Sequence, residues 1–148
     1  MSDHLVVAGN GMVGQRLVEA LRDRDTGRRW RVTVLAEEPR PAYDRVNLSS
    51  YFDGAAPAEL DLVADGCYGA GGYALHLDDA VTGIDRAARA VTTSRGRTVG
   101  YDALVLATGS SPFVPPVPGA SLPGWPATPT SGRRGWPTRP SCAGSCRS

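Results

Sequence analysis

The sequence lacks the features that mark several classes of protein. No apolar run comes near the roughly 20 residues of a membrane-spanning helix, and the first residues do not have the basic-then-apolar pattern of a signal peptide. The three cysteines are unevenly spaced and predict no disulfide framework. The net charge of +1 gives no attraction to nucleic acid or a membrane surface. We therefore expect a cytoplasmic protein without nucleic-acid or membrane partners, and 148 residues predict one domain.

The chain is rich in glycine, and the most informative glycines form a motif near the N-terminus. Residues 4–8 are an apolar run, residues 9–14 read Gly-Asn-Gly-Met-Val-Gly, and an amphipathic segment continues to residue 22. A strand, a glycine turn and a helix start in this order form the context in which G-x-G-x-x-G binds a dinucleotide. The alternative is a glycine-rich turn without a ligand. On the helix, Val13 is expected to face the core and Gln15 the solvent.

Each motif position has a role in a dinucleotide site. Gly9 makes the tight turn, Gly11 lets backbone approach a pyrophosphate, and Gly14 lets helix and strand pack closely. The backbone amides at the helix start, around Met12 and Val13, point at the anion, and the helix dipole favours it. We predict that these five residues bind the cofactor.

An acidic pair follows the second predicted strand, which covers the β-branched segment 30–36. An acid about 20 residues beyond the glycines binds the ribose hydroxyls of a dinucleotide. We favour Glu37 over Glu38, because Glu38 precedes a proline and is expected to turn away. The alternative is that both are ordinary surface acids. Segment 39–52 is expected to be a loop first, and its apolar end can start a helix. Arg45 is the residue there suited to a phosphate or flavin contact.

The rest of the chain predicts further elements. Apolar residues at helical spacing predict a helix over 55–68 with Cys67 on its core face, and 73–77 predicts a short strand. Three short segments joined by tight turns predict an antiparallel meander: 80–85, 90–93 and 98–101. Residues 103–107 are apolar on both faces, which predicts a buried parallel strand. No metal site is predicted, since His76 stands alone among these segments.

Two stretches together resemble one family. Residues 9–16 (GNGMVGQR) and 37–52 (EEPRPAYDRVNLSSYF) resemble the N-terminus of the large subunit of assimilatory NAD(P)H-dependent nitrite reductase, in the pyridine nucleotide-disulfide oxidoreductase superfamily. Related ferredoxin and rubredoxin reductases share a looser plan and usually carry a lysine where this chain has Ser50. The resemblance covers residues 4–124. It implies that the cofactor is FAD, a choice that the residues alone leave open.

The resemblance also implies a partial Rossmann-like α/β FAD-binding domain, with a parallel central sheet, helices and an antiparallel meander. It assigns FAD contacts to five residues: Gly9, Gly11, Gly14, Glu37 and Arg45. The strand that carries Val81 would offer backbone groups to the adenine. Ala107, Thr108 and Gly109 form a second signature, where small residues let backbone pass close to the nucleotide.

The chemistry that the resemblance implies is electron transfer in nitrate assimilation. In the full-length family, NAD(P)H reduces FAD, and electrons pass through an iron–sulfur centre to sirohaem, where nitrite becomes ammonium. A small nitrite reductase subunit is the partner to expect there. The sequence itself predicts no catalytic acid, base or nucleophile. Two alternatives stay open, a fragment of a ferredoxin- or rubredoxin-reductase-type flavoenzyme and a non-catalytic nucleotide-binding remnant.

The composition changes after Gly124. Residues 125–148 contain four arginines, four prolines and no acidic residue, without helical or strand periodicity. Two cysteines there are too few for a zinc or iron–sulfur site. We therefore predict an incomplete FAD-binding domain over 1–124 and a disordered tail over 125–148, with a shifted reading frame as the hypothesis that the encoding DNA tests. Because the family completes this domain with a later strand and helix, we predict weak FAD retention and little activity of this chain alone.

Overall fold

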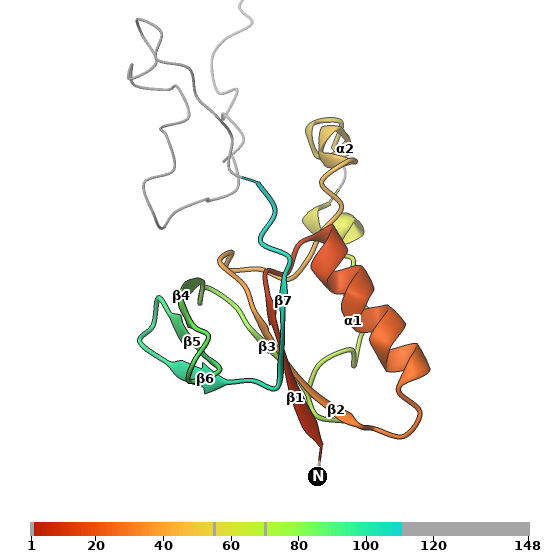
Figure 1. Ribbon diagram of the computed structural model, residues 1–148. Helices are drawn as coiled ribbons and strands as arrows, with labels where there is room; N and C mark the ends of the chain where they lie inside the picture. The colour runs from red at the N-terminus through yellow and green to blue at the C-terminus, as the bar shows by residue number, and fades with distance from the viewer. Residues whose placement is uncertain (1, 55, 70, 111–148) are drawn as a thin grey trace, which may run out of the picture. The chain divides into compact units, whose positions relative to one another are not determined.

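The structure is a computed structural model that describes residues 2–54, 56–69 and 71–110. The predicted boundary at residue 124 and the predicted tail over 125–148 lie outside the described residues. The chain opens with strand β1 (Asp3–Ala8), helix α1 (Met12–Arg24) and strand β2 (Trp30–Leu35). This is the strand, turn, helix and strand order that the glycine motif predicts (Figure 1).

Strands β1 and β2 belong to a parallel sheet of four strands. Its order is β3-β2-β1-β7, with β3 at Tyr73–His76 and β7 at Ala103–Leu106. In the register of the sheet, Ala8 pairs with both Leu35 and Leu106, so β1, β2 and β7 end at the same level. The parallel central sheet expected from the sequence is confirmed.

The parallel sheet is apolar on both faces because each face is covered. Val7 and Val34 are fully buried in a cluster with Val18 of α1. On the opposite face, Val6 and Leu35 pack with Val91 of the second sheet. Strands covered on both faces read as continuous apolar runs, which explains why β1 and β2 were recognisable in the sequence.

The second sheet is the predicted antiparallel meander. It consists of β4 (Val81–Asp85), β5 (Ala90–Thr93) and β6 (Thr98–Gly100), in the order β4-β5-β6. Figure 1 shows it on the side of the parallel sheet away from α1. The prediction of a meander, and with it a mixed α/β domain, is confirmed.

The helix predicted over 55–68 is wrong. The described residues there form a short 3₁₀ helix, η1 (Pro57–Leu60), followed by irregular chain. Two backbone hydrogen bonds explain this: Leu62 N–H donates to the Ala42 carbonyl at 2.9 Å, and Asp44 N–H donates to the Leu60 carbonyl at 2.8 Å. This pairing takes backbone groups that an α-helix would use. Cys67 is nevertheless in the core, 3% exposed, as predicted.

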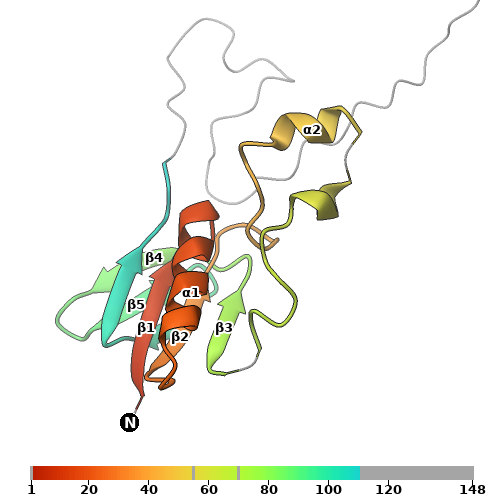
Figure 2. The same cartoon turned by 90° about the vertical axis from the view of Figure 1, so that its right-hand side faces the viewer.

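A short helix, α2 (Leu48–Phe52), forms at the apolar end of segment 39–52, where the sequence allows a helix to start. Figure 2 shows α2 and η1 beyond the carboxyl ends of the parallel strands.

The predicted phase of α1 is wrong at two positions, because Gln15 is 1% exposed and Val13 is 76% exposed. The buried residues of α1 are Gly14, Gln15 and Val18, and Leu17 and Leu21 pack against the core as predicted.

The prediction that β7 is a fully buried strand is also wrong. Its residues are partly buried, and Leu106 is 62% exposed. The reason is its position, since within the described part of the chain β7 pairs with β1 alone and forms one edge of the sheet.

Candidate functional site

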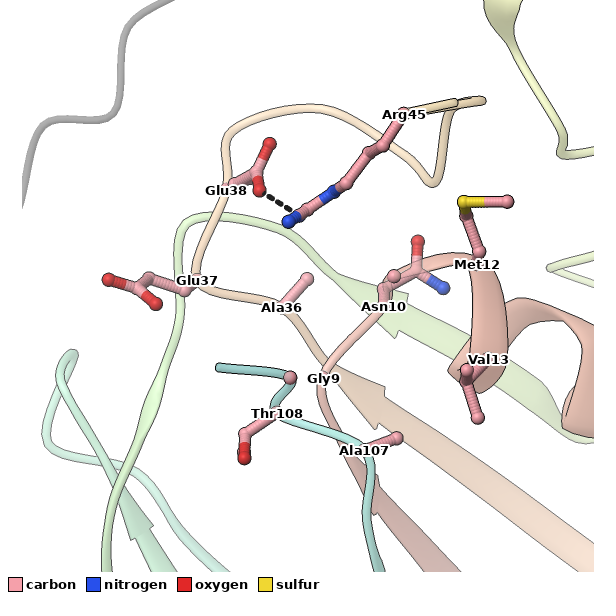
Figure 3. Close-up of a pocket in the computed structure, with 12 residues that line it drawn as sticks. Gly9, Asn10, Met12, Val13, Ala36, Glu37, Glu38, Arg45, Ala107 and Thr108 are labelled. Carbon is pink, nitrogen blue, oxygen red and sulfur yellow. Dashed lines mark hydrogen bonds and ion pairs between the residues drawn. The ribbon is translucent and has the colours of Figure 1, made fainter. Parts of the chain in front are cut away.

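A pocket of about 350 Å³ opens at the carboxyl ends of β1, β2 and β7. The strand order changes direction here, because the chain places β2 on one side of β1 and β7 on the other. Open α/β sheets bind ligands in the crevice outside such a switch point. Twelve residues line the pocket (Figure 3): Gly9, Asn10, Gly11, Met12, Val13, Ala36, Glu37, Glu38, Arg45, Ala107, Thr108 and Gly109.

The structure brings the predicted cofactor residues together, with Gly14 and Val81 outside the lining. The Val81 side chain packs against the cluster between the two sheets, so the expected backbone contact with adenine stays a prediction. The sequence reasoning missed Asn10, Ala36 and Glu38. The motif leaves the position of Asn10 unspecified and therefore gave no signal for it.

The three glycines of the turn differ in what surrounds them. Gly9 has φ +108°, and a Cβ there would lie 2.3 Å from the Ala107 carbonyl oxygen. A Cβ on Gly14 would lie 2.4 Å from the Gly9 carbonyl oxygen. A Cβ on Gly11 would meet no atom within 4 Å. Gly9 and Gly14 thus serve the packing of turn, helix and β7, whereas Gly11 borders open space.

Helix α1 presents its N-terminus to this pocket. Gly11 is the N-cap, no side chain caps the helix, and the first turn holds no acidic residue. The first N–H groups of a helix have no acceptor within the helix, and the helix dipole places partial positive charge there. Met12 and Val13 carry two of these N–H groups and line the pocket. The arrangement suits a phosphate or diphosphate group.

The other wall of the pocket carries charged side chains. Glu38 forms an ion pair with Arg45, and both line the pocket. Arg45 also lies over the Tyr43 ring, 5.4 Å from its centroid. Burial, with a smaller contribution from nearby Glu38, raises the pKa of Tyr43. These contacts hold the Arg45 guanidinium at the pocket.

The two acids at the end of β2 take different directions. In Figure 3, the Glu38 carboxylate points toward Arg45 and the Glu37 carboxylate points away from it. Glu37 is exposed, whereas the Glu38 side chain is 18% exposed. The expectation that Glu38 turns away from the site is wrong, because its ion pair with Arg45 keeps it in the lining. The assignment of Glu37 to the ribose stays a prediction.

The residues that follow β7 complete the pocket. Ala107 N–H donates to the Ala8 carbonyl at 2.8 Å, which extends the pairing with β1 by one residue. This brings the Ala107 carbonyl against Gly9. Gly109, with φ +72°, then turns the chain. The two sequence signatures thus pack directly on each other.

The described residues hold no group of three or more His, Cys, Asp or Glu side chains suited to a metal ion. His76 instead lies with its Nδ1 atom 2.9 Å from an Arg97 guanidinium nitrogen. Within residues 2–54, 56–69 and 71–110, no helix has the length and apolar character that crossing a membrane requires.

Comparisons with known proteins agree with this geometry. The pyridine nucleotide-disulphide oxidoreductase family model matches residues 3–134. The NADH nitrite reductase large subunit of Escherichia coli is 45% identical over 116 residues, which cover 78% of this chain and 14% of that subunit. The assimilatory nitrate reductase electron transfer subunit of Bacillus subtilis is 38% identical over 121 residues, covering 81% of this chain and 16% of that protein.

A solved structure shows the same fold. The ferredoxin reductase for the CYP199A2 system of Rhodopseudomonas palustris superposes with a TM-score of 0.74 at 30% identity, covering 82% of this chain and 30% of that one. The resemblance inferred from the residues is confirmed. The chain spans about one seventh of the length of the curated relatives named above.

Proposed function

The chain belongs to the pyridine nucleotide-disulphide oxidoreductase family, and we propose that its pocket binds the adenine dinucleotide part of FAD. The observation that carries this proposal is the combination of open space at Gly11 with an uncapped helix N-terminus. A diphosphate needs both features, since its oxygens approach the backbone closely and accept hydrogen bonds from N–H groups. Carboxylates of Glu37 and Glu38 at the same pocket suit ribose hydroxyls.

Each group of lining residues would contact a different part of the nucleotide. The N–H groups of Met12 and Val13 would hold the diphosphate, and the Arg45 guanidinium would neutralise part of its charge. Glu37 would accept hydrogen bonds from the ribose. The backbone at residues 107–109 would pass along the nucleotide. When bound, FAD supplies the redox chemistry, and these residues bind and orient it.

We further propose that the chain corresponds to the N-terminal part of an NAD(P)H-dependent nitrite reductase large subunit. Its place would be the entry of an electron path that runs from NAD(P)H through FAD toward an iron–sulfur and sirohaem centre reducing nitrite to ammonium. The 45% identity to the E. coli subunit exceeds the 30% identity to the ferredoxin reductase and favours nitrite reductase over that alternative. A small nitrite reductase subunit would be the partner of the whole protein.

Equilibrium titration of the full 148-residue chain with FAD and with ADP tests the binding proposal. Titration is preferable to the colour of the purified protein, because we predict weak retention of FAD. We expect saturable binding of both ligands at one site. A chain that binds neither ligand would refute the proposal, and a yellow protein with equimolar flavin would refute the predicted weak retention.

Three single variants test whether Glu37 or Glu38 binds the ribose. Glu37→Gln removes a charged acceptor from the ribose and is expected to weaken ADP binding about tenfold, the size of one charge-assisted hydrogen bond. Glu59→Gln is the matched control, because Glu59 is exposed and outside the pocket lining. Glu38→Gln decides between the two acids. A loss confined to Glu38→Gln would refute the assignment of the ribose to Glu37.

A further inference from the structure

A polar network lies behind the glycine turn and beside the proposed nucleotide pocket. The Tyr68 hydroxyl donates to Gln15 Oε1 at 2.8 Å. Asn10 Nδ2 lies 3.2 Å from the Tyr68 hydroxyl oxygen and 3.3 Å from Gln15 Oε1. These three side chains therefore form a closed triangle that joins the turn, helix α1 and the chain segment before β3.

The network is centred on a buried carboxamide, with Asn10 and Tyr68 partly exposed. Gln15 is 1% exposed, and its Nε2 atom also donates to Glu19 Oε1 at 3.1 Å. Burial raises the pKa of the Tyr68 hydroxyl, which therefore stays protonated and able to donate. Buried hydrogen bonds fix side-chain direction, because losing a partner leaves a polar group unsatisfied. The triangle thus restrains the Asn10 side chain.

Asn10 transmits this restraint to the pocket on its other side. Its Oδ1 atom accepts a hydrogen bond from the Ala42 N–H at 2.8 Å. Ala42 is 1% exposed and lies three residues before Arg45. Asn10 itself lines the pocket, directly between Gly9 and Gly11. One carboxamide therefore links the turn to the segment that carries the pocket's guanidinium.

We propose that Tyr68 and Gln15 are positioning residues for diphosphate binding, acting through Asn10. This inference rests on the proposed function, and it assigns a role to residues that lie outside the pocket lining. The Tyr68 hydroxyl and the Gln15 amide hold Asn10 in one orientation. Asn10 in turn fixes the backbone of the glycine turn relative to Ala42, and with it the distance between the helix N-terminus and Arg45.

A second buried tyrosine provides a matched control. Tyr73 is 7% exposed, and among the described residues its hydroxyl has no hydrogen-bond partner. Tyr73→Phe and Tyr68→Phe remove the same atom from neighbouring parts of one core. Tyr68→Phe alone breaks the triangle that holds Asn10.

The experiment compares both variants with the wild-type full chain, using ADP and AMP as probes. AMP shares the adenine and ribose of ADP and has one phosphate fewer, so it depends less on the turn. We expect Tyr68→Phe to weaken ADP binding about tenfold and AMP binding less than about twofold, whereas Tyr73→Phe leaves both affinities unchanged. Gln15→Met, which removes the acceptor at similar volume, is expected to reproduce the ADP effect.

A second readout needs no ligand. Amide hydrogen exchange at Ala42 reports the hydrogen bond to Asn10 Oδ1 directly. We expect it to accelerate at least about tenfold in Tyr68→Phe and to stay unchanged in Tyr73→Phe. If Tyr68→Phe does not fold, Gln15→Met serves both measurements.

The outcomes separate this proposal from the proposed function. Wild-type chain that binds neither ADP nor FAD refutes the proposed function. Wild-type binding with an unchanged ADP affinity in Tyr68→Phe and Gln15→Met overturns the positioning role and leaves the pocket intact. Equal losses for ADP and AMP overturn it too, because they indicate general destabilisation. Unchanged exchange at Ala42 overturns the mechanism through Asn10.

Discussion

Replacing Gly11 by alanine tests whether the open space at the turn belongs to a ligand. The Gly11 backbone has φ −90° and ψ −171°, a conformation that any residue adopts. An added Cβ would meet no atom within 4 Å. The cost to folding is therefore the N-cap preference for glycine over alanine, about 0.5–1 kcal/mol. The expected cost to binding is larger, because the methyl group would occupy the proposed path of the diphosphate.

Overpacking by one methyl group costs about 1–3 kcal/mol. At the diphosphate this corresponds to a loss of ADP affinity of roughly fivefold to 150-fold. The combination of a nearly unchanged stability and a strongly reduced affinity is the expected signature of Gly11→Ala. It identifies a residue that is needed for the ligand and not for the fold.

Gly9→Ala is the contrasting variant. Its Cβ would lie 2.3 Å from the Ala107 carbonyl oxygen, at φ +108°. Backbone strain of about 1–3 kcal/mol and overpacking of about 1–3 kcal/mol act together, against the 5–15 kcal/mol that stabilise a typical domain. Gly14→Ala carries the steric penalty alone, since its Cβ would lie 2.4 Å from the Gly9 carbonyl oxygen without a positive φ.

Urea denaturation followed by circular dichroism measures the stability of the three variants, and calorimetric titration with ADP measures their affinity. Gly11→Ala that binds ADP as tightly as the wild-type chain would refute the assignment of the open space to a ligand. Gly9→Ala with wild-type stability would refute the close packing between the turn and Ala107.

Two further predictions concern charged groups away from the pocket. Asp79 is fully buried, with its Oδ2 atom 3.3 Å from Arg97 Nε and its Oδ1 atom accepting from the Arg95 N–H at 3.1 Å. Asp79→Ala leaves that N–H without its acceptor and is expected to lower the free energy of unfolding by about 1–3 kcal/mol. Asp78→Ala, which breaks an exposed pair, is expected to cost less than about 1 kcal/mol, and equal losses in urea denaturation would contradict this. Burial, followed by Arg31, lowers the pKa of His4 below 6.5. The unfolded chain then binds more protons than the folded chain, so stability falls as the pH drops through 6.5. His4→Gln should reduce this loss between pH 7.5 and 5.5, and an unchanged loss would contradict the role of His4.

The fold could be predicted from the sequence where the local residue pattern agrees with the tertiary environment. The last four residues of β1 and of β2 are buried because both faces are covered there, one by α1 and one by β5. The meander was readable because its turns are short, with three strands between Val81 and Gly100. The pocket residues followed from the same logic, since the motif specifies the glycines through backbone geometry that the structure shows at Gly9 and Gly14.

The fold could not be predicted from the sequence where the conformation of one segment depends on pairing with a distant segment. The apolar spacing over 55–68 is that of a helix, yet the backbone of residues 60–62 pairs with residues 42–44. Gly66 has φ +72°, which a helix does not allow. Neither the pairing nor the glycine conformation leaves a periodic signal, so a test of helical periodicity alone could not detect them.

The two errors on α1 have a common origin in the site. Polarity predicts Val13 inside and Gln15 outside, and the structure reverses both. Val13 is exposed because the first turn of α1 borders the pocket, and Gln15 is buried because Tyr68 and Asn10 satisfy its carboxamide. Departures from local rules that flank one turn are expected where function constrains the fold. An exposed valine and a buried glutamine within three residues therefore mark the pocket-facing end of this helix as clearly as the glycines do.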